Sequence, residues 1–343
     1  MAYEKRTVYF DGLRLLATFA VILLHICARP WETQSIDSAE WAIFNVLDSA
    51  VRWCVPLFVM LSGALFLNPD KEVRFKTLCR KNILRIATAF FFWSAIYTAI
   101  EWGRGLHLRD LPLSFLKGEY HMWFLFLIAG LYLFVPLLRK ITCSKKRTEW
   151  FLVLTGAFLI LIPRLLNFLG LLGAAVPFLN VNTILMNINA VSFCYFFYFM
   201  LGHYLHQYDI AKDLRGVIYA FGFLGFAATA GLTFWHSQTV GMPSGMFFVY
   251  MSLGVMAMAV AIFIFGKYHF QKGSAWLSAA SGYSFGIYLA HILVLDLLEW
   301  LGLTPMGLHP LLSVPLLGIS VFLLSLLLSA VIHRIPVLKK YVV

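Results

Sequence analysis

The residues best suited to chemistry lie in one apolar stretch, residues 9–29, which has the sequence YFDGLRLLATFAVILLHICAR. The stretch is apolar enough to cross a bilayer, yet it contains Asp11, Arg14 and His25. An ionisable side chain inside a membrane span is costly, and it is by default a sign of function. Histidine supplies a base that works near neutral pH, and arginine binds phosphate as a bidentate donor. These residue types suit acid–base chemistry beside a bound anion.

The spacing of Arg14 and His25 places both on one face of a helix. Eleven residues at ~100° each bring the helix to within about 20° of whole turns. At ~1.5 Å per residue the two lie ~16 Å apart along the axis, about half of the ~30 Å hydrocarbon core. One face therefore offers a cation toward one side of the membrane and an imidazole toward the other. Either residue alone also fits a structural role, with Arg14 extending to the surface or His25 buried in the core; the pair on one stripe favours function.

Composition indicates the kind of element that positions these residues. The chain has 343 residues, of which 61% are hydrophobic and 13% are charged. A soluble domain has ~25% charged residues, and apolar segments of about 20 residues are typical of membrane helices rather than barrel strands. The net charge of +11 is interpreted as membrane topology, because no aromatic platform for nucleic-acid bases accompanies the basic residues. Five dispersed cysteines, without metal-ligand spacing, predict neither a metal site nor a disulfide framework.

We therefore expect an all-α polytopic membrane protein, a single membrane domain over residues 1–343. The ten predicted spans are about 8–28, 43–67, 83–101, 121–138, 150–169, 188–206, 216–235, 246–266, 279–300 and 311–333. Of the 27 Lys and Arg residues, 19 fall on the side of the two termini, 5 on the other side and 3 within spans. The positive-inside rule then places both termini in the cytoplasm.

The second predicted span carries Asp48 and Arg52 four residues apart, a spacing that suits a salt bridge. In a membrane such a pair is either structural or part of a functional cavity. The same span continues as VPLFVMLSGALF, and we expect Pro56, Ser62 and Gly63 to interrupt it. Small residues and proline in a span permit close helix approach or a break that lines a cavity.

The loop before the third span is basic and ends in Arg80 and Lys81, and Arg85 lies just inside the span. One interpretation is ordinary cytoplasmic charge attracted to anionic lipid. The other is recognition of a phosphorylated donor by arginine and lysine. The chain contains neither a Walker-type loop nor a GxGxxG loop, so nucleotide hydrolysis has no support.

Two further spans carry candidate site residues, the first of them at the outer side of the membrane. His121 and Trp123 begin the fourth span, where an aromatic residue is normally an interfacial anchor. His121 shares an expected membrane level with His25 and Arg52. The ninth span carries Tyr288 and His291 three residues apart, which predicts either a hydrogen bond in the core or part of a site.

Four blocks of the sequence resemble the membrane acyltransferase 3 family. They are FDGLRLLATFAVILLH, VPLFVMLSGALF, HMWFLFLIAGLYLFVPLL and SFGIYLAHILVL, in the family's order and over most of the chain. Ala64 stands where the family usually has tyrosine. With ten spans and no fused esterase-like domain, the chain is similar to the stand-alone branch that includes the enterobacterial common antigen O-acetyltransferase.

The resemblance implies an enzyme of the bacterial cytoplasmic (inner) membrane. It would move an acetyl group from cytoplasmic acetyl-CoA, a co-substrate rather than a bound cofactor, to a hydroxyl of an extracytoplasmic glycan or lipid-linked saccharide. Membrane lipids are the remaining expected partners, and nucleic acid is not. On this hypothesis His25 is the base or the acyl carrier, Arg14 holds the donor and Asp11 orients Arg14. Further substrate or donor contacts are expected from Arg52, Arg80, Lys81, Arg85, His121, Trp123, Tyr288 and His291.

Two other functions compete with acyl transfer on the residues alone. Intramembrane Arg, Asp and His also mark proton relays, so a proton-coupled transporter or a flippase is the main alternative. A structural or assembly subunit is the second, and it would tolerate loss of His25.

Overall fold

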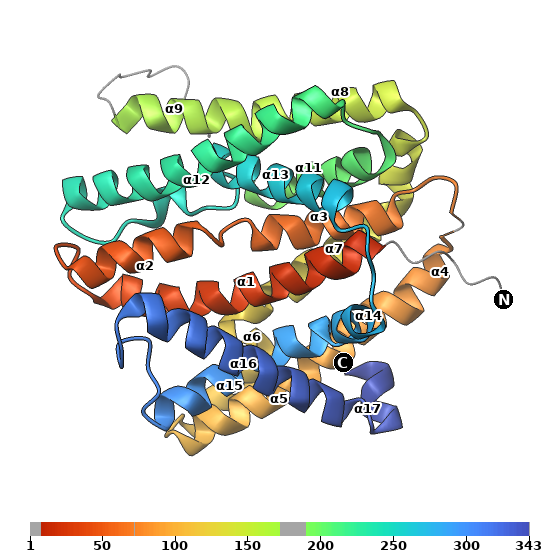
Figure 1. The fold of residues 1–343 in the computed structure, drawn as a ribbon. Coiled ribbons are helices and arrows are strands. Elements are labelled where there is room, and N and C mark those ends of the chain that lie inside the picture. Colours follow the sequence, from red (N-terminus) through yellow and green to blue (C-terminus); the bar gives the residue numbers. More distant parts are fainter. Residues whose placement is uncertain (1–7, 72, 172–189, 343) are drawn as a thin grey trace. The chain divides into compact units, whose positions relative to one another are not determined.

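The computed structural model describes residues 8–71, 73–171 and 190–342, which form helices and contain no strand (Figure 1). The N-terminal half holds α1 (Val8–Thr33), α2 (Ala39–Ser49), α3 (Cys54–Phe66), α4 (Phe75–Leu78), η1 (Cys79–Ile83), α5 (Leu84–Gly103), η2 (Leu108–Asp110), α6 (Leu111–Lys117), η3 (Tyr120–Met122), α7 (Trp123–Thr142), α8 (Lys145–Thr155), η4 (Gly156–Leu161) and α9 (Ile162–Leu171). The C-terminal half holds α11 (Ala190–Gln207), α12 (Lys212–Val240), η5 (Gly245–Phe247), α13 (Leu253–His269), α14 (Ala275–Gly282), α15 (Ser284–Trp300), α16 (Pro310–Ile332) and α17 (Pro336–Tyr341).

The predicted all-α polytopic membrane fold is confirmed. Within the described residues, seven helical segments are long and apolar enough to cross a membrane. An eighth arises if α14 and α15, which meet at a bend of 61°, form one broken span. The predicted sixth and eighth spans correspond to α11 and to α13, and α13 is an apolar helix shorter than the other spans.

The helices gather into two compact units, each made of separated chain segments. The first unit contains residues 1–70 and 137–274, and the second contains residues 71–136 and 275–343. In the first unit α3 packs on α11, α12 packs on α13, and α1 contacts α2, α3 and α13. In the second unit α15 packs on α16, and α5 packs on α6 and α17.

The second predicted span is broken, but not where the sequence suggests. The helix stops at Ser49 and resumes at Cys54, so the interruption is the turn of residues 50–53. Pro56 is accommodated in the first turn of α3, where its missing N–H has no helical partner to lose. Helix α3 then runs unbroken through Ser62 and Gly63.

Glycine sets the close approach of α3 and α11. A Cβ atom on Gly63 would overlap the backbone carbonyl of Phe199, and one on Gly202 would overlap the carbonyl of Met60. The two glycines thus face the partner backbone from opposite helices. The expectation that the small residues of this span allow close helix packing is met at Gly63.

The second unit has its own apolar core. Trp93 and Tyr97, one turn apart on α5, are buried against α15 and the residues that begin α7. The core residues are Ala89, Phe90, Trp93, Tyr97, Met122, Leu125, Leu289, Ala290, Ile292, Ile332 and Val342. This core holds the start of α7 beside the middle of α15.

Replacing Gly63 by alanine should destabilise the fold. The added methyl meets a backbone carbonyl, which cannot rotate away, so α3 and α11 must separate, at a cost of about 2 kcal/mol. Thermal unfolding of the purified protein in detergent measures the change. Gly231→Ala on α12 is the matched control, because its Cβ meets no heavy atom within 4 Å and should be neutral or stabilising. Equal melting temperatures for Gly63→Ala and the wild type would contradict this packing.

Candidate functional site

Helix α1 carries the predicted stripe without a break. It runs from Val8 to Thr33, so the ~16 Å axial separation of Arg14 and His25 holds. Asp11 and Arg14 lie one turn apart, with Nη1 of Arg14 3.7 Å from Oδ1 of Asp11. The Asp11 side chain is 3% exposed and that of Arg14 is 29% exposed. His25 is half-buried on the same helix.

The location of Asp11 suits an anion that anchors a cation. It lies in the first turn of α1, where the helix dipole favours negative charge. The carboxylate is buried while the guanidinium remains partly accessible. This geometry places the buried carboxylate where it can orient the partly exposed Arg14 side chain.

Arg52 forms a second buried ion pair, on another side of α1. Its guanidinium donates to the carboxylate of Asp48, which is completely buried, and its Cζ lies 4.1 Å from the centroid of the Phe248 ring. Cys27 interacts electrostatically with both members of the pair. Because Cys27 follows His25 by two residues, or about 200° around the helix, the Cys27 side of α1 is not the Arg14–His25 stripe. The structure therefore groups Arg52 with Asp48, Phe248 and Cys27.

The second unit brings three predicted site residues together. The ring centroids of His121 and His291 are 5.0 Å apart, and those of His121 and Tyr288 are 5.4 Å apart. The Tyr288 hydroxyl donates to the backbone carbonyl of His121. His121 is 2% exposed and His291 is fully buried. Trp123, two residues after His121, is instead exposed, as expected for an interfacial anchor.

The contact at His291 defines its protonation pattern. Its Nδ1 lies 2.5 Å from the carbonyl oxygen of Tyr288, and a carbonyl oxygen only accepts hydrogen bonds. We therefore assign the proton of the neutral ring to Nδ1. The lone pair then resides on Nε2, which is the nitrogen that can accept a proton.

Tyr97 is a further member of this cluster that sequence reasoning did not find. Its hydroxyl donates to the carbonyl of Leu289 at 2.8 Å and accepts from the amide of Leu293 at 3.2 Å. These are the two ends of one turn of α15, and His291 lies between them. The Tyr97 ring also contacts the His121 ring edge-to-face, with centroids 5.6 Å apart. No motif marks Tyr97, because its partners are about 190 residues away in the chain.

A π-helical turn, η1, forms part of the predicted basic segment that contains Arg80, Lys81 and Arg85. Arg80 and Lys81 lie in η1 and are exposed. Arg85 follows in the first turn of α5, half-buried, with its Cζ 5.3 Å from the centroid of the Phe285 ring. Within the described residues the Nε of Arg85 has no hydrogen-bond partner. The segment therefore carries two exposed cations and one partly buried arginine.

In the part of the chain that the structure describes, no group of three or more His, Cys, Asp or Glu side chains is arranged to hold a metal ion.

A family model described as an acyltransferase domain matches residues 7–334. The chain belongs to the acyltransferase 3 family. No curated protein and no solved structure matches it.

Membership of the acyltransferase 3 family makes this chain a multi-pass membrane acyltransferase. The matched range includes all four sequence blocks described above, with Asp11 to His25, the turn that contains Arg52, His121 and His291. Histidine is a common proton acceptor in group transfer, and among the described residues His25 lies on α1 while His121 and His291 lie in ring contact in the second unit.

The Asp48–Arg52 pair should behave as a unit in stability. Arg52→Met leaves a buried carboxylate without its cation and should cost about 3–5 kcal/mol, whereas the Asp48→Leu, Arg52→Met double variant should recover most of that loss. Unfolding of the single and double variants in detergent tests this double-mutant cycle. Additive losses would show that the two side chains are not coupled. Activity of the stable double variant then separates a structural role of Arg52 from contact with substrate.

Proposed function

We propose that this acyltransferase moves an acetyl group from acetyl-CoA to a hydroxyl of an extracytoplasmic glycan or lipid-linked saccharide. The observation that carries the proposal is the unbroken helix α1, which holds the Asp11–Arg14 pair and His25 on one stripe. The proposed setting is the stand-alone branch of the family, with residues 1–343 acting as one domain in a bacterial inner membrane. Both termini would face the cytoplasm, the side of the donor.

The proposed chemistry uses His25 as its proton acceptor. The acceptor hydroxyl attacks the thioester carbonyl, a C–O bond forms, the C–S bond breaks and CoA leaves as its thiol. The proton lost by the hydroxyl passes through the imidazole of His25 to the leaving sulfur. In the two-step version, His25 first takes the acetyl group and then gives it to the hydroxyl.

The Arg14 end of the α1 stripe would hold the donor. CoA is polyanionic, and a guanidinium fixed by a buried carboxylate binds phosphate without first having to be ordered. Arg14 oriented by Asp11 fits this role. The ~16 Å to His25 is a distance that an extended pantetheine arm bridges in large part.

The other predicted site residues would supply further contacts for the donor and the acceptor. We assign Arg80, Lys81 and Arg85 to donor phosphates, because they are basic and Arg85 is half-buried beside an aromatic ring. His121, Tyr288 and His291 would line the acceptor site and stabilise developing charge, with Trp123 at its membrane boundary. Arg52 would contact the substrate or donor while it is held by its ion pair with Asp48.

A proton-coupled transporter or flippase is the alternative that the buried histidine pair favours. Buried ionisable groups in contact are also the components of a proton relay. A transporter moves an unmodified substrate across a vesicle, whereas a transferase leaves an acetylated product. Product analysis with labelled acetyl-CoA distinguishes the two.

Replacement of His25 by alanine should abolish most acetyl transfer. Loss of a general base costs about 10²–10⁴-fold in rate, and loss of an acyl carrier costs at least as much. The measurement is transfer of labelled acetyl from acetyl-CoA to total membrane glycan by the purified, folded variant. His309→Ala, at an exposed histidine, is the matched control. Normal turnover by His25→Ala would rule out both roles, and labelled acetyl trapped on the wild type but not on the variant would select the carrier.

Replacement of Arg14 should act on donor binding. Arg14→Ala removes a charge-assisted contact and should weaken acetyl-CoA binding by roughly tenfold or more, with a smaller loss for Arg14→Lys. Calorimetry on the purified protein measures the dissociation constant. Arg109→Ala, which removes an exposed arginine elsewhere in the chain, should leave binding unchanged. Wild-type affinity in a folded Arg14→Ala variant would move the donor site away from α1.

A further inference from the structure

The first unit contains an apolar cavity of about 310 Å³ between α12, α13 and the turn before α3. Its lining includes Trp53, Tyr219, Phe223, Phe226, Ile262 and Phe265. The volume lies at the lower end of the ~300–1,000 Å³ range of ligand pockets. Small residues shape it, because Gly222 faces Ala261 so closely that a Cβ on the glycine would overlap the alanine side chain.

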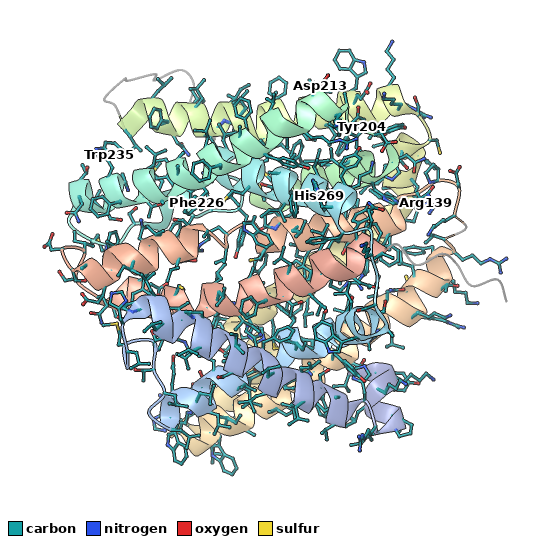
Figure 2. The ribbon with its side chains drawn as sticks, in the orientation of Figure 1. Arg139, Tyr204, Asp213, Phe226, Trp235 and His269 are labelled. Atoms are coloured by element: carbon teal, nitrogen blue, oxygen red, sulfur yellow. The ribbon has the colours of Figure 1, made fainter. Side chains whose placement is uncertain are left out.

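This cavity adjoins an exposed apolar surface of α12. Phe223, which lines the cavity, is 68% exposed, and its neighbours Phe221 and Leu224 are also exposed. Helix α12 is a membrane-spanning helix with little of its apolar surface buried. Figure 2 shows its side chains from Asp213 at the start, past Phe226, to Trp235 near the end. An occupant of the cavity would therefore enter from the membrane.

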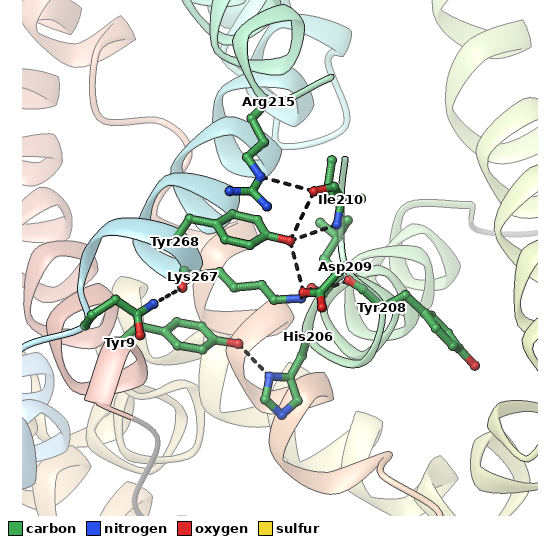
Figure 3. A network of polar contacts seen from close by, with 10 residues as sticks. Tyr9, His206, Tyr208, Asp209, Ile210, Arg215, Lys267 and Tyr268 are labelled. Atoms are coloured by element: carbon green, nitrogen blue, oxygen red, sulfur yellow. Dashed lines mark hydrogen bonds and ion pairs between the residues drawn. The ribbon is translucent and has the colours of Figure 1, made fainter. Parts of the chain in front are cut away.

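One turn before Tyr219, Arg215 is held rigidly at the polar end of the same region. Its Nε donates to the carbonyl of Ile210 at 3.1 Å, and its Cζ lies 3.3 Å from the centroid of the Tyr268 ring (Figure 3). The Tyr268 hydroxyl is itself fixed, since it accepts from the amide of Ile210 at 2.8 Å and donates to Asp209 at 3.1 Å. The guanidinium is thus ordered before any ligand arrives.

The charge of Arg215 is not neutralised by an ion pair within the described residues. The nearby Asp209 is paired with Lys267, whose Nζ lies 3.0 Å from Oδ1 of Asp209. The hydrogen bond and charge of Lys267 are the main causes that hold the pKa of Asp209 below its ordinary value. Lys212 and Asp213 are both exposed in the first turn of α12 and offset each other, while the helix dipole there is positive. The polar end of the region therefore favours an anion.

The depth of the two features matches one leaflet. Tyr219 and Phe226 lie four and eleven residues beyond Arg215, or ~6–16 Å further along α12. Half of a ~30 Å hydrocarbon core is ~15 Å. A guanidinium at the interface and an apolar cavity below it fit the phosphate and the acyl chain of one lipid.

We infer that the cavity between α12 and α13 is a binding site for one anionic phospholipid, with an acyl chain in the cavity and its phosphate on Arg215. The bound lipid belongs to the leaflet that meets the Lys212 end of α12. The cavity adjoins the turn that carries Arg52, and the proposal does not depend on the identity of the acyl acceptor.

Native mass spectrometry of the full-length protein in detergent tests the site. The probes are palmitoyl-oleoyl phosphatidylglycerol, phosphatidylcholine with the same chains, and glycerol 3-phosphate as a headgroup without chains. The wild type should retain phosphatidylglycerol over phosphatidylcholine by roughly tenfold, because a charge-assisted contact favours the anion. Arg215→Gln should bring the ratio close to one. Ile262→Trp should reduce retention of both lipids, because it fills the cavity.

Matched controls separate the site from general effects of charge and size. Lys146→Gln removes an exposed cation of the same unit, and Leu224→Trp enlarges an exposed apolar residue of α12 outside the cavity. Both should bind as the wild type does. If Ile262→Trp does not fold, Phe226→Trp fills the same space. An unchanged lipid preference in Arg215→Gln would overturn the headgroup assignment, and equal competition by glycerol 3-phosphate would overturn the acyl-chain assignment.

Discussion

The cost of placing charge inside a membrane governs much of this structure. Asp11 with Arg14 and Asp48 with Arg52 each bring a carboxylate and a guanidinium together within one helical turn, and in both pairs the carboxylate is the buried partner. A buried carboxylate without a cation would be far more costly than the pair. Each arginine therefore lies beside a carboxylate that is three or four residues away in the chain. The same solution supports a donor-binding role at Arg14 and a largely structural role at Arg52.

Close helix packing is the second physical constraint on this structure. With no hydrophobic driving force between helices in lipid, α3 and α11 associate through paired glycines that let the backbones meet, and α12 meets α13 through Gly222 and Ala261. The α12–α13 contact also produces a cavity, because large aromatic residues surround the small ones. Close packing and the cavity thus share one cause in this unit.

The histidines of the two units differ in their surroundings. His25 lies half-buried on a stripe with an accessible arginine, which suits a group that must meet substrate. His121 and His291 lie in ring contact within an apolar core, held by the Tyr288 hydroxyl and by Tyr97 on one turn of α15. Such a cluster is ordered by many contacts, which fix the positions of its rings. The acyltransferase 3 family match covers both sites.

The sequence by itself determined the all-α membrane class and the Arg14–His25 stripe, because hydropathy and helical periodicity are local properties. It also identified Asp11–Arg14 and Asp48–Arg52 as pairs, since residues three or four apart meet on one helix. The tertiary structure decided what lies far apart in the chain: the break at residues 50–53 rather than at Pro56, the contact of His121 with His291, and the position of Tyr97. It alone placed Arg215 on Tyr268, one turn from an apolar cavity. These features depend on which helices pack together, and helical periodicity carries no information about the partner.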